Sequence, residues 1–402
     1  MVLVDPLRHA LGIVVVAFVA GYALWLATRL ADRAVRAWAV ASFLAHAAIG
    51  IAIWYRFPSL VANDAATYEA QALGVRVANA GKEGFPLLLG AIYSAIGRAP
   101  VAGLILNALC MGLLVVVVAN TARRLGNSQA ARYAAIMAAV LPPFLWWGSQ
   151  LLREAPMWIL LALVAETAIA IAIDGLSWRR AIWLLALCLP MLTIRAPIAA
   201  VVAVSLAVGL LFAGAPRPGD HARRAALIVG AVILAAFLFP RFAALQSLQE
   251  EDSASIVNSR NYLATANTGF GEAAAPTNYG LVGQLPSTLP LVTFGPLPWQ
   301  LPSSGLPAVA DTLSWWFVLY WAVRGFGPLY RRYGRAAWVL VGPASALILV
   351  LALTLANFGI VIRMRAMVAV LLLPYAAAGL VVAAERRHAR EVPSRAARAL
   401  SA

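Results

Sequence analysis

Residues 101–122, VAGLILNALCMGLLVVVVANTA, decide the fold class, because they form an apolar run without a single charged side chain. An α-helix needs about 20 mainly apolar residues to cross the hydrocarbon core of a bilayer. Similar runs recur from end to end of the 402-residue chain, in which 63% of the residues are hydrophobic and only 12% are charged. The sequence therefore predicts an all-α, polytopic membrane protein in which residues 1–402 form a single transmembrane domain.

The apolar runs predict eleven transmembrane helices. No small-residue cleavage site follows the first run, so we interpret it as an uncleaved membrane helix and not as a signal peptide. The stretch 84–97, GFPLLLGAIYSAIG, is shorter than a span and is expected to form an interfacial or re-entrant helix. The expected spans cover residues 10–28, 38–55, 100–121, 130–148, 155–173, 180–193, 197–213, 225–240, 307–324, 336–356 and 365–384.

Basic side chains predict the orientation of these helices. Arginines gather in alternate connections, as at Arg123 and Arg124, and basic loops stay in the cytoplasm. The N-terminus is then outside, and the basic tail 385–402 is inside. Two long stretches, 56–99 and 241–306, become extracytoplasmic loops, the first with interfacial helices. These loops have room for a substrate pocket outside the lipid.

Charged residues at the outward ends of the helices are the candidates for a functional site. Ionisable side chains at membrane depth are costly and tend to mark substrate or ion paths. Guanidinium groups bind phosphate oxygens bidentately, and a loop carboxylate can serve as a general base. The candidate base is Asp64 in NDAATYEAQ, and the candidate substrate-binding residues are Glu69, Arg153 and Glu154 in WWGSQLLREAP, Arg195 in LTIRAP, Arg260 in NSRNY, and Arg363 and Arg365 in NFGIVIRMR.

The same residues also have structural explanations. Arg153 and Glu154 are adjacent and do not face each other on a helix, yet either can pair with another helix and orient it. Long arginine side chains can also snorkel to the membrane interface, where the charged group stays hydrated. This explanation applies to Arg195, Arg363 and Arg365.

Other features exclude some classes of function. The formal net charge is +15, but the basic residues punctuate apolar segments and form no basic, aromatic-interleaved surface, so no nucleic acid partner is expected. Four scattered histidines make a zinc site of clustered histidines impossible. His46 is expected to be a packed core residue, and Glu166 a paired or interface-reaching side chain more than a relay residue. The two cysteines lie in apolar runs and are interpreted as packing residues.

The order of several motifs resembles the bacterial GT-C superfamily of membrane glycosyltransferases. These motifs are NDAATYEAQA, GFPLLLGAIYSAIG, LNALCMGLLVVVVANTARRLG, LPPFLWWGSQLLREAP and TIRAP. They are similar to the protein O-mannosyltransferase and aminoarabinose transferase families over roughly the first 215 residues. The second half, with PLPW and NFGIVIRMR, resembles only the cell-surface polysaccharide branch.

The resemblance implies a polyprenyl-phosphate sugar donor and transfer to a glycan, lipid or protein acceptor of the cell envelope, on the outer face of the bacterial inner membrane. In such families a carboxylate of the first outer loop serves as base or metal ligand, which corresponds here to Asp64. Family members often have two neighbouring acids there, whereas Ala65 follows Asp64 and Glu69 is the nearest other carboxylate. The resemblance therefore leaves open whether a divalent metal is needed. The lipid phosphate would bind Arg153, Arg195 and Arg363 or Arg365.

Two other functions remain alternatives. An O-antigen polymerase or ligase also joins lipid-linked glycans outside the cell and would use an undecaprenyl diphosphate oligosaccharide. A lipid or glycan transporter is the third, although transporters favour broken helices at corresponding places in two repeated halves. Prolines interrupt the first half of this chain without a counterpart set in the second.

Overall fold

The computed structural model describes residues 6–77, 81–214, 282–297, 305–355 and 357–400, together with positions 219, 222, 224, 225 and 270. These residues form helices joined by short connections, and no β-strand occurs among them. The prediction of an all-α membrane protein is confirmed. The expected helix 225–240, most of the stretch 241–306, and Arg260 lie outside the described residues.

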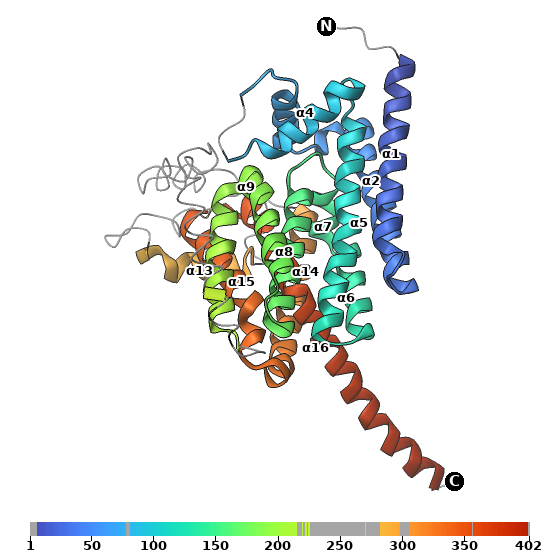
Figure 1. Ribbon diagram of the computed structural model, residues 1–402. Helices are drawn as coiled ribbons and strands as arrows, with labels where there is room; N and C mark the ends of the chain where they lie inside the picture. The colour runs from blue at the N-terminus through green and yellow to red at the C-terminus, as the bar shows by residue number, and fades with distance from the viewer. Residues whose placement is uncertain are drawn as a thin grey trace.

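Seven described segments are long and apolar enough to cross a membrane (Figure 1). One of them, Ala308–Thr354, contains two helices joined by a 3-10 turn at Gly334–Ala337. The long helices are α1 (Pro6–Thr28), α2 (Arg33–Arg56), α5 (Pro100–Leu125), α8 (Glu154–Asp174), α9 (Trp178–Phe212), α14 (Gly305–Tyr333), α15 (Trp338–Thr354) and α16 (Phe358–Leu400).

Helix α9 reverses direction at Arg195. The backbone there is extended (φ −159°, ψ 78°) and not helical, and Pro197, two residues later, lacks the N–H that a continuous helix would need. After the break the second arm of α9 runs back to the end of the bundle where α8 finishes. Arg224 shows this, because it donates hydrogen bonds to the carbonyl oxygens of Leu210 in α9 and Ile171 near the C-terminus of α8. The expected helices 180–193 and 197–213 are thus the two arms of α9.

The single helix expected over residues 130–148 is wrong. The structure has α6 (Ser128–Val140) and α7 (Pro142–Gly148) instead. Between them Leu141 is extended (φ −62°, ψ 130°), because a residue that precedes a proline avoids the helical region. At 13 residues α6 is shorter than a span.

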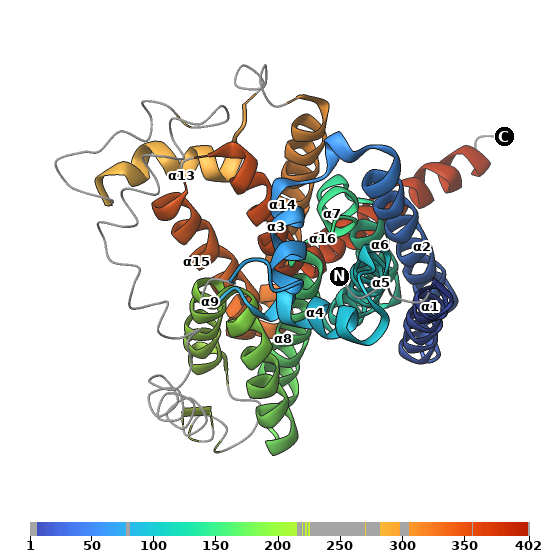
Figure 2. The same cartoon turned by 90° about the horizontal axis from the view of Figure 1, so that it is seen from above.

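Two short helices cover one end of the bundle: α3 (Asn63–Ala72) and α4 (Gly84–Ile96). Gly84 at the start of α4 packs against Thr193 of α9, and the carbonyl oxygen of Ile96 at its other end bonds His9 of α1. Helix α4 therefore lies across the bundle from α9 to α1, as the view from above shows (Figure 2). We call this end the site end; α8 begins there with Glu154.

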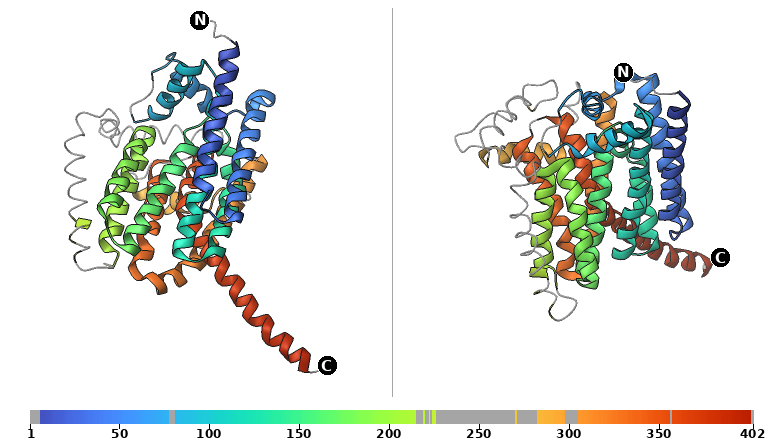
Figure 3. Two further views of the ribbon diagram at one scale, coloured as in Figure 1. Left: turned by 45° about the vertical axis from the view of Figure 1, so that its right-hand side comes forward. Right: turned by 45° about the horizontal axis from the view of Figure 1, so that its top comes forward.

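The opposite end is the basic end. Helix α5 finishes there with Arg123 and Arg124, and α9 begins there with Arg179 and Arg180. Arg123 bonds Asp32, the N-cap of α2, and so holds α2 against α5 at this end. The C-terminal part of α16 continues beyond the bundle here (Figure 3).

The core between these ends is apolar, with few polar groups. His46 of α2 is fully buried and bonds the carbonyl oxygens of Ser42 at 2.6 Å and Phe144 at 3.1 Å. It is therefore the packed, hydrogen-bonded histidine that the sequence predicts.

Candidate functional site

Glu154 is the centre of a buried charge cluster at the site end. It is the first residue of α8, and its side chain is 0% exposed. Its Oε1 atom accepts a hydrogen bond from Arg195 Nη2 at 3.2 Å and another from Arg363 Nε at 2.7 Å. Arg363 Nη2 lies 2.6 Å from the same oxygen, in an ion pair without hydrogen-bond geometry. One carboxylate thus pairs with two guanidinium groups from different helices.

Arg363 joins this cluster to Asp64. Its Nη1 atom donates to Asp64 Oδ2 at 2.5 Å, across 299 positions of sequence. The guanidinium also lies 5.8 Å from the centre of the Trp147 ring, within the range of a cation–π interaction. Arg363 is shielded by the protein, whereas the Asp64 side chain is 53% exposed. Asp64 is therefore held by a buried cation and is open to a ligand on its other side.

Arg153 lies beside the cluster with hydrogen-bond capacity to spare. It is 8% exposed and donates from Nη1 to the carbonyl oxygen of Ile194, next to the break in α9. Its guanidinium is 5.6 Å from the ring of Tyr68, and no described residue accepts a hydrogen bond from its Nε atom. Burial raises the pKa of Tyr68, and the nearby Arg153 counteracts part of that rise. Tyr68 therefore stays a neutral phenol beside the arginine.

Arg365 lies on a different face of α16 from Arg363. It is 1% exposed, and Nε, Nη1 and Nη2 all lack hydrogen-bond partners among the residues that the structure describes. Its guanidinium is 5.8 Å from the ring of Trp315 on α14, and Asp311 lines the same small gap without an ion pair to it. A buried guanidinium without partners is costly unless a ligand or water satisfies it.

Two polar residues that the sequence interpretation missed hold the site together. Gln150 Oε1 accepts from the backbone N–H of Ala62 at 2.7 Å, just before α3. The carbonyl oxygens of Gln150 and Leu152 both accept from Asn107 of α5. These bonds connect the segment that carries Asp64 to the turn that carries Arg153 and Glu154. Asn107 is a buried amide inside the mainly apolar run 101–122. An amide within such a run could have been recognised from the sequence as a candidate for a structural hydrogen bond.

Glu69 has a different environment from the other candidates. Both of its oxygens accept from Arg98, at 2.9 and 3.0 Å, and this bidentate pair joins α3 to the connection between α4 and α5. The hydrogen bonds to Glu69 raise the pKa of Arg98. The cluster around Glu154 does not include Glu69, so its contacts indicate a residue that holds α3 in place.

We expect Glu69→Gln to loosen α3. The change removes one partner of a charge-assisted pair whose arginine is largely exposed, so the free energy of unfolding should fall by about 1 kcal/mol. Hydrogen exchange of residues 63–72 and the thermal midpoint in detergent measure the effect. Lost donor binding at unchanged stability would instead make Glu69 a substrate ligand.

The structure brings most of the predicted site residues together, although their roles stay predictions. Asp64, Glu154, Arg195 and Arg363 form one bonded network, with Arg153 beside it. The alternative that arginines reach out to the membrane interface is wrong for Arg195, Arg363 and Arg365, because protein encloses all three.

The described part of the cluster does not fit a divalent metal. No group of three or more His, Cys, Asp or Glu among the described residues lies close enough to hold one. Arg363 itself occupies the position between Asp64 and Glu154 that a cation would take. We therefore derive no chemical step through a metal.

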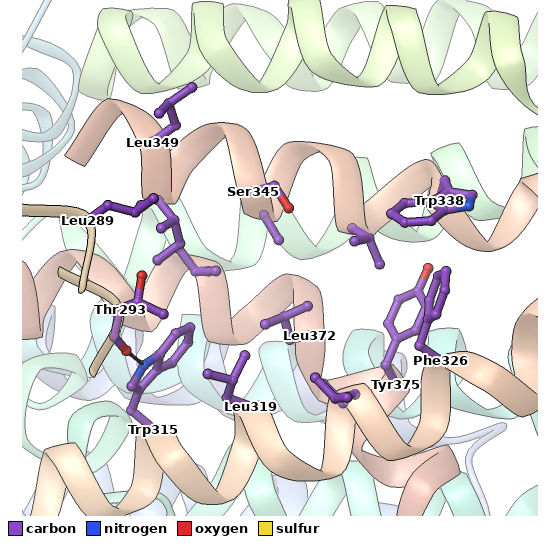
Figure 4. Close-up of a pocket in the computed structure, with 16 residues that line it drawn as sticks. Leu289, Thr293, Trp315, Leu319, Phe326, Trp338, Ser345, Leu349, Leu372 and Tyr375 are labelled. Atoms are coloured by element: carbon purple, nitrogen blue, oxygen red, sulfur yellow. Dashed lines mark hydrogen bonds between the residues drawn. The ribbon is translucent and has the colours of Figure 1, made fainter. Parts of the chain in front are cut away.

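An apolar cavity of about 530 Å³ lies between α14, α15 and α16, and the short helix α13 (Leu285–Phe294) adds to its wall. Figure 4 shows side chains from these four helices pointing into it, with Trp315 fixed by a 2.6 Å hydrogen bond to the carbonyl oxygen of Thr293. Trp315 is also the ring that Arg365 covers. The cavity opens on the side of the bundle, where Val323 and Trp338 on its wall are exposed.

Comparison with known proteins identifies the fold. No family model and no curated protein sequence matches the chain. Two solved structures are similar to it: the Archaeoglobus fulgidus oligosaccharyltransferase in the apo form, with a TM-score of 0.52, and the archaeal oligosaccharyltransferase AglB from the same organism, in complex with an inhibitory peptide and a dolichol-phosphate, with a TM-score of 0.50. The chain has the GT-C fold.

The sequence identity and the coverage limit what this similarity shows. In both comparisons the sequence identity is 14%, and the match covers 89% of this chain but 52% of the other. The chain therefore spans about half the length of the proteins that it matches. The likeness concerns the GT-C fold, and the expected GT-C resemblance is confirmed at that level.

Proposed function

We propose that this GT-C chain is a membrane glycosyltransferase that moves a sugar from a polyprenyl-phosphate donor to an acceptor hydroxyl in the cell envelope. The observation that carries the proposal is the network in which Arg363 links the exposed Asp64 to the buried Glu154. It supplies a candidate base beside buried cations, and Arg365 on the same helix contacts Trp315 in the wall of an apolar cavity. A lipid-linked sugar needs all three: a base for the acceptor, cations for the phosphate and an apolar wall for the chain.

The described contacts suggest separate roles for the arginines. Arg195 and Arg363 are already neutralised by carboxylates, so their main role would be to hold Glu154 and Asp64 in position. Arg153 and Arg365 have unsatisfied donors and would bind the phosphate oxygens. Glu154 Oε2 also lacks a partner within the described part of the chain and would accept a hydrogen bond from a sugar hydroxyl.

The reaction follows from these roles. Asp64 accepts the proton of the acceptor hydroxyl while that oxygen forms a bond to the anomeric carbon. The bond between the anomeric carbon and the phosphate oxygen breaks, and the phosphate leaves with the electron pair. Negative charge grows on the phosphate in this step, so arginines positioned beforehand stabilise the transition state more than the ground state.

The apolar cavity is suited to the polyprenyl chain. Its wall follows α14 from Trp315 to Phe326, about 16 Å along the helix axis. It lies beside Arg365 through the shared ring of Trp315. A phosphate at Arg365 would therefore bring the first isoprene units to this wall.

The distribution of charge supports an extracytoplasmic site. The basic connections lie at the end of the bundle opposite Glu154 and would face the cytoplasm. The fold of the archaeal oligosaccharyltransferases, one of which binds a dolichol-phosphate, supports a lipid-linked donor.

Transfer in proteoliposomes tests the proposal. Purified protein should move a labelled sugar from a polyprenyl monophosphate donor to an envelope extract. The variant Ser345→Trp fills the cavity with a large side chain. It should raise the KM for long-chain donors about ten-fold and have little effect on the KM for farnesyl-linked donors. Activity only with an undecaprenyl diphosphate oligosaccharide would favour a polymerase or ligase. Movement of lipid without formation of a glycosidic bond would favour a transporter.

A further inference from the structure

A groove of about 310 Å³ lies at the basic end, on the opposite side of the bundle from Glu154. It forms where α5 and α8 end and α9 begins. Charged and aromatic side chains share its wall, which consists of Arg124, Glu166, Thr167, Ala170, Arg179, Arg180 and Trp183. The proposed transfer reaction uses none of these residues.

Two of the three arginines in the groove share one carboxylate. Asp174, the last residue of α8, pairs with both Arg124 and Arg180. Arg180 also donates to the carbonyl oxygens of Ala170 at 3.1 Å and Gly175 at 2.7 Å, and so closes the C-terminus of α8. These contacts give Arg124 and Arg180 a structural role, because they join α5, α8 and α9 at this end.

Arg179 and Glu166 line the groove without a salt bridge to any described residue. Arg179 lies 5.6 Å from the ring of Trp178, and within the described residues neither Arg179 nor Glu166 has an ion-pair partner. Glu166 lies eight residues before the end of α8, about 12 Å inside the span. A carboxylate at that depth is costly, and such residues tend to be functional.

We propose that this groove binds the headgroup of an aminophospholipid, with its phosphate at Arg179 and its primary ammonium at Glu166. One unpaired cation and one unpaired anion in the same groove complement a zwitterion. A primary ammonium donates hydrogen bonds to a carboxylate, whereas a quaternary choline nitrogen has no N–H. A glycerol headgroup has no positive charge, so it would give Glu166 no ammonium to pair with.

The surface beside the groove indicates that the occupant comes from the membrane. Trp178, Ile182 and Trp183 are 69%, 57% and 53% exposed there. Tryptophan is typical of the membrane–water interface, where an apolar ring lies against the acyl chains. The acyl chains would lie along these side chains while the headgroup enters the groove from the side.

Native mass spectrometry of the full chain tests this site. The protein is taken from nanodiscs that contain equal amounts of phosphatidylethanolamine, phosphatidylcholine and phosphatidylglycerol. We expect about a five-fold preference for phosphatidylethanolamine, the size that one partly exposed ion pair provides. Glu166→Gln should abolish the preference for phosphatidylethanolamine over phosphatidylglycerol, and Arg179→Gln should reduce retention of all three lipids.

The controls separate binding from folding. Arg132→Gln removes an exposed arginine of the same end outside the groove and should leave lipid retention unchanged. Arg179 is itself exposed, so its variant should fold even if Glu166→Gln does not. Equal retention of phosphatidylglycerol in the wild type, or retention unchanged in Arg179→Gln, would overturn the proposal.

Discussion

Asp64→Asn should lower the rate of sugar transfer by about 10²- to 10⁴-fold, the range that general-base catalysis typically contributes. An amide retains an oxygen that can accept the hydrogen bond from Arg363 Nη1, so the geometry of α3 should persist. The amide cannot take up the proton of the acceptor hydroxyl, so the chemical step should slow. Single-turnover transfer from a labelled polyprenyl-phosphate donor measures the loss.

Two measurements make this prediction specific. Donor binding should stay within about two-fold of the wild type, because the phosphate ligands are unchanged. Glu83→Gln serves as the control. Glu83 lies between α3 and α4, and its described side-chain contact is a hydrogen bond from the backbone N–H of Lys82. This variant should retain activity. Full activity in Asp64→Asn would remove this residue from the mechanism and leave the GT-C fold unaffected.

Glu154→Gln should destabilise the protein more than any other single substitution at the site. The change leaves Arg195 and Arg363 buried without the charge that they share. Removal of one partner of a buried ion pair costs about 3–5 kcal/mol, because the remaining charge stays desolvated. We expect a clear fall in the thermal midpoint in detergent, together with loss of transfer.

Asp32→Asn provides the matched control for this effect. Asp32 pairs with Arg123 at the basic end, where the two side chains are 28% and 37% exposed. Pairs of this kind contribute about 0–1 kcal/mol, so the midpoint should change little. The double variant Glu154→Gln/Arg195→Met should recover part of the stability, because it also removes an uncompensated cation. Equal midpoints for Glu154→Gln and Asp32→Asn would contradict a buried network.

Predictions from the sequence succeeded where local chemistry decides the structure. Runs of apolar residues predicted helices, because only a helix satisfies its own backbone groups in lipid. The break in α9 was predicted to separate two helices, and it lies at Arg195, next to the proline that disfavours the helix. The prediction of one helix over residues 130–148 failed, because Pro142 and Pro143 end α6 before them although the stretch is mainly apolar.

The same reasoning placed charges along the bundle but did not identify their partners. Helix direction and length determine depth, so the sequence alone put Asp64, Glu154 and Arg363 at one end. Which of them touch depends on how each helix is rotated about its axis and which helix packs beside it. That is why Arg363 meets Glu154 while Arg365, two residues later, faces Asp311 and Trp315.

The sequence by itself thus determined the membrane class, most of the helices and the end of the bundle where charge gathers, because hydropathy and proline act on neighbouring residues. Only the tertiary structure decided which carboxylate neutralises which arginine, that Gln150 and Asn107 connect the two halves of the site, and where the apolar cavity lies. Those features join residues as far apart as Asp64 and Arg363, and packing between distant helices determines them.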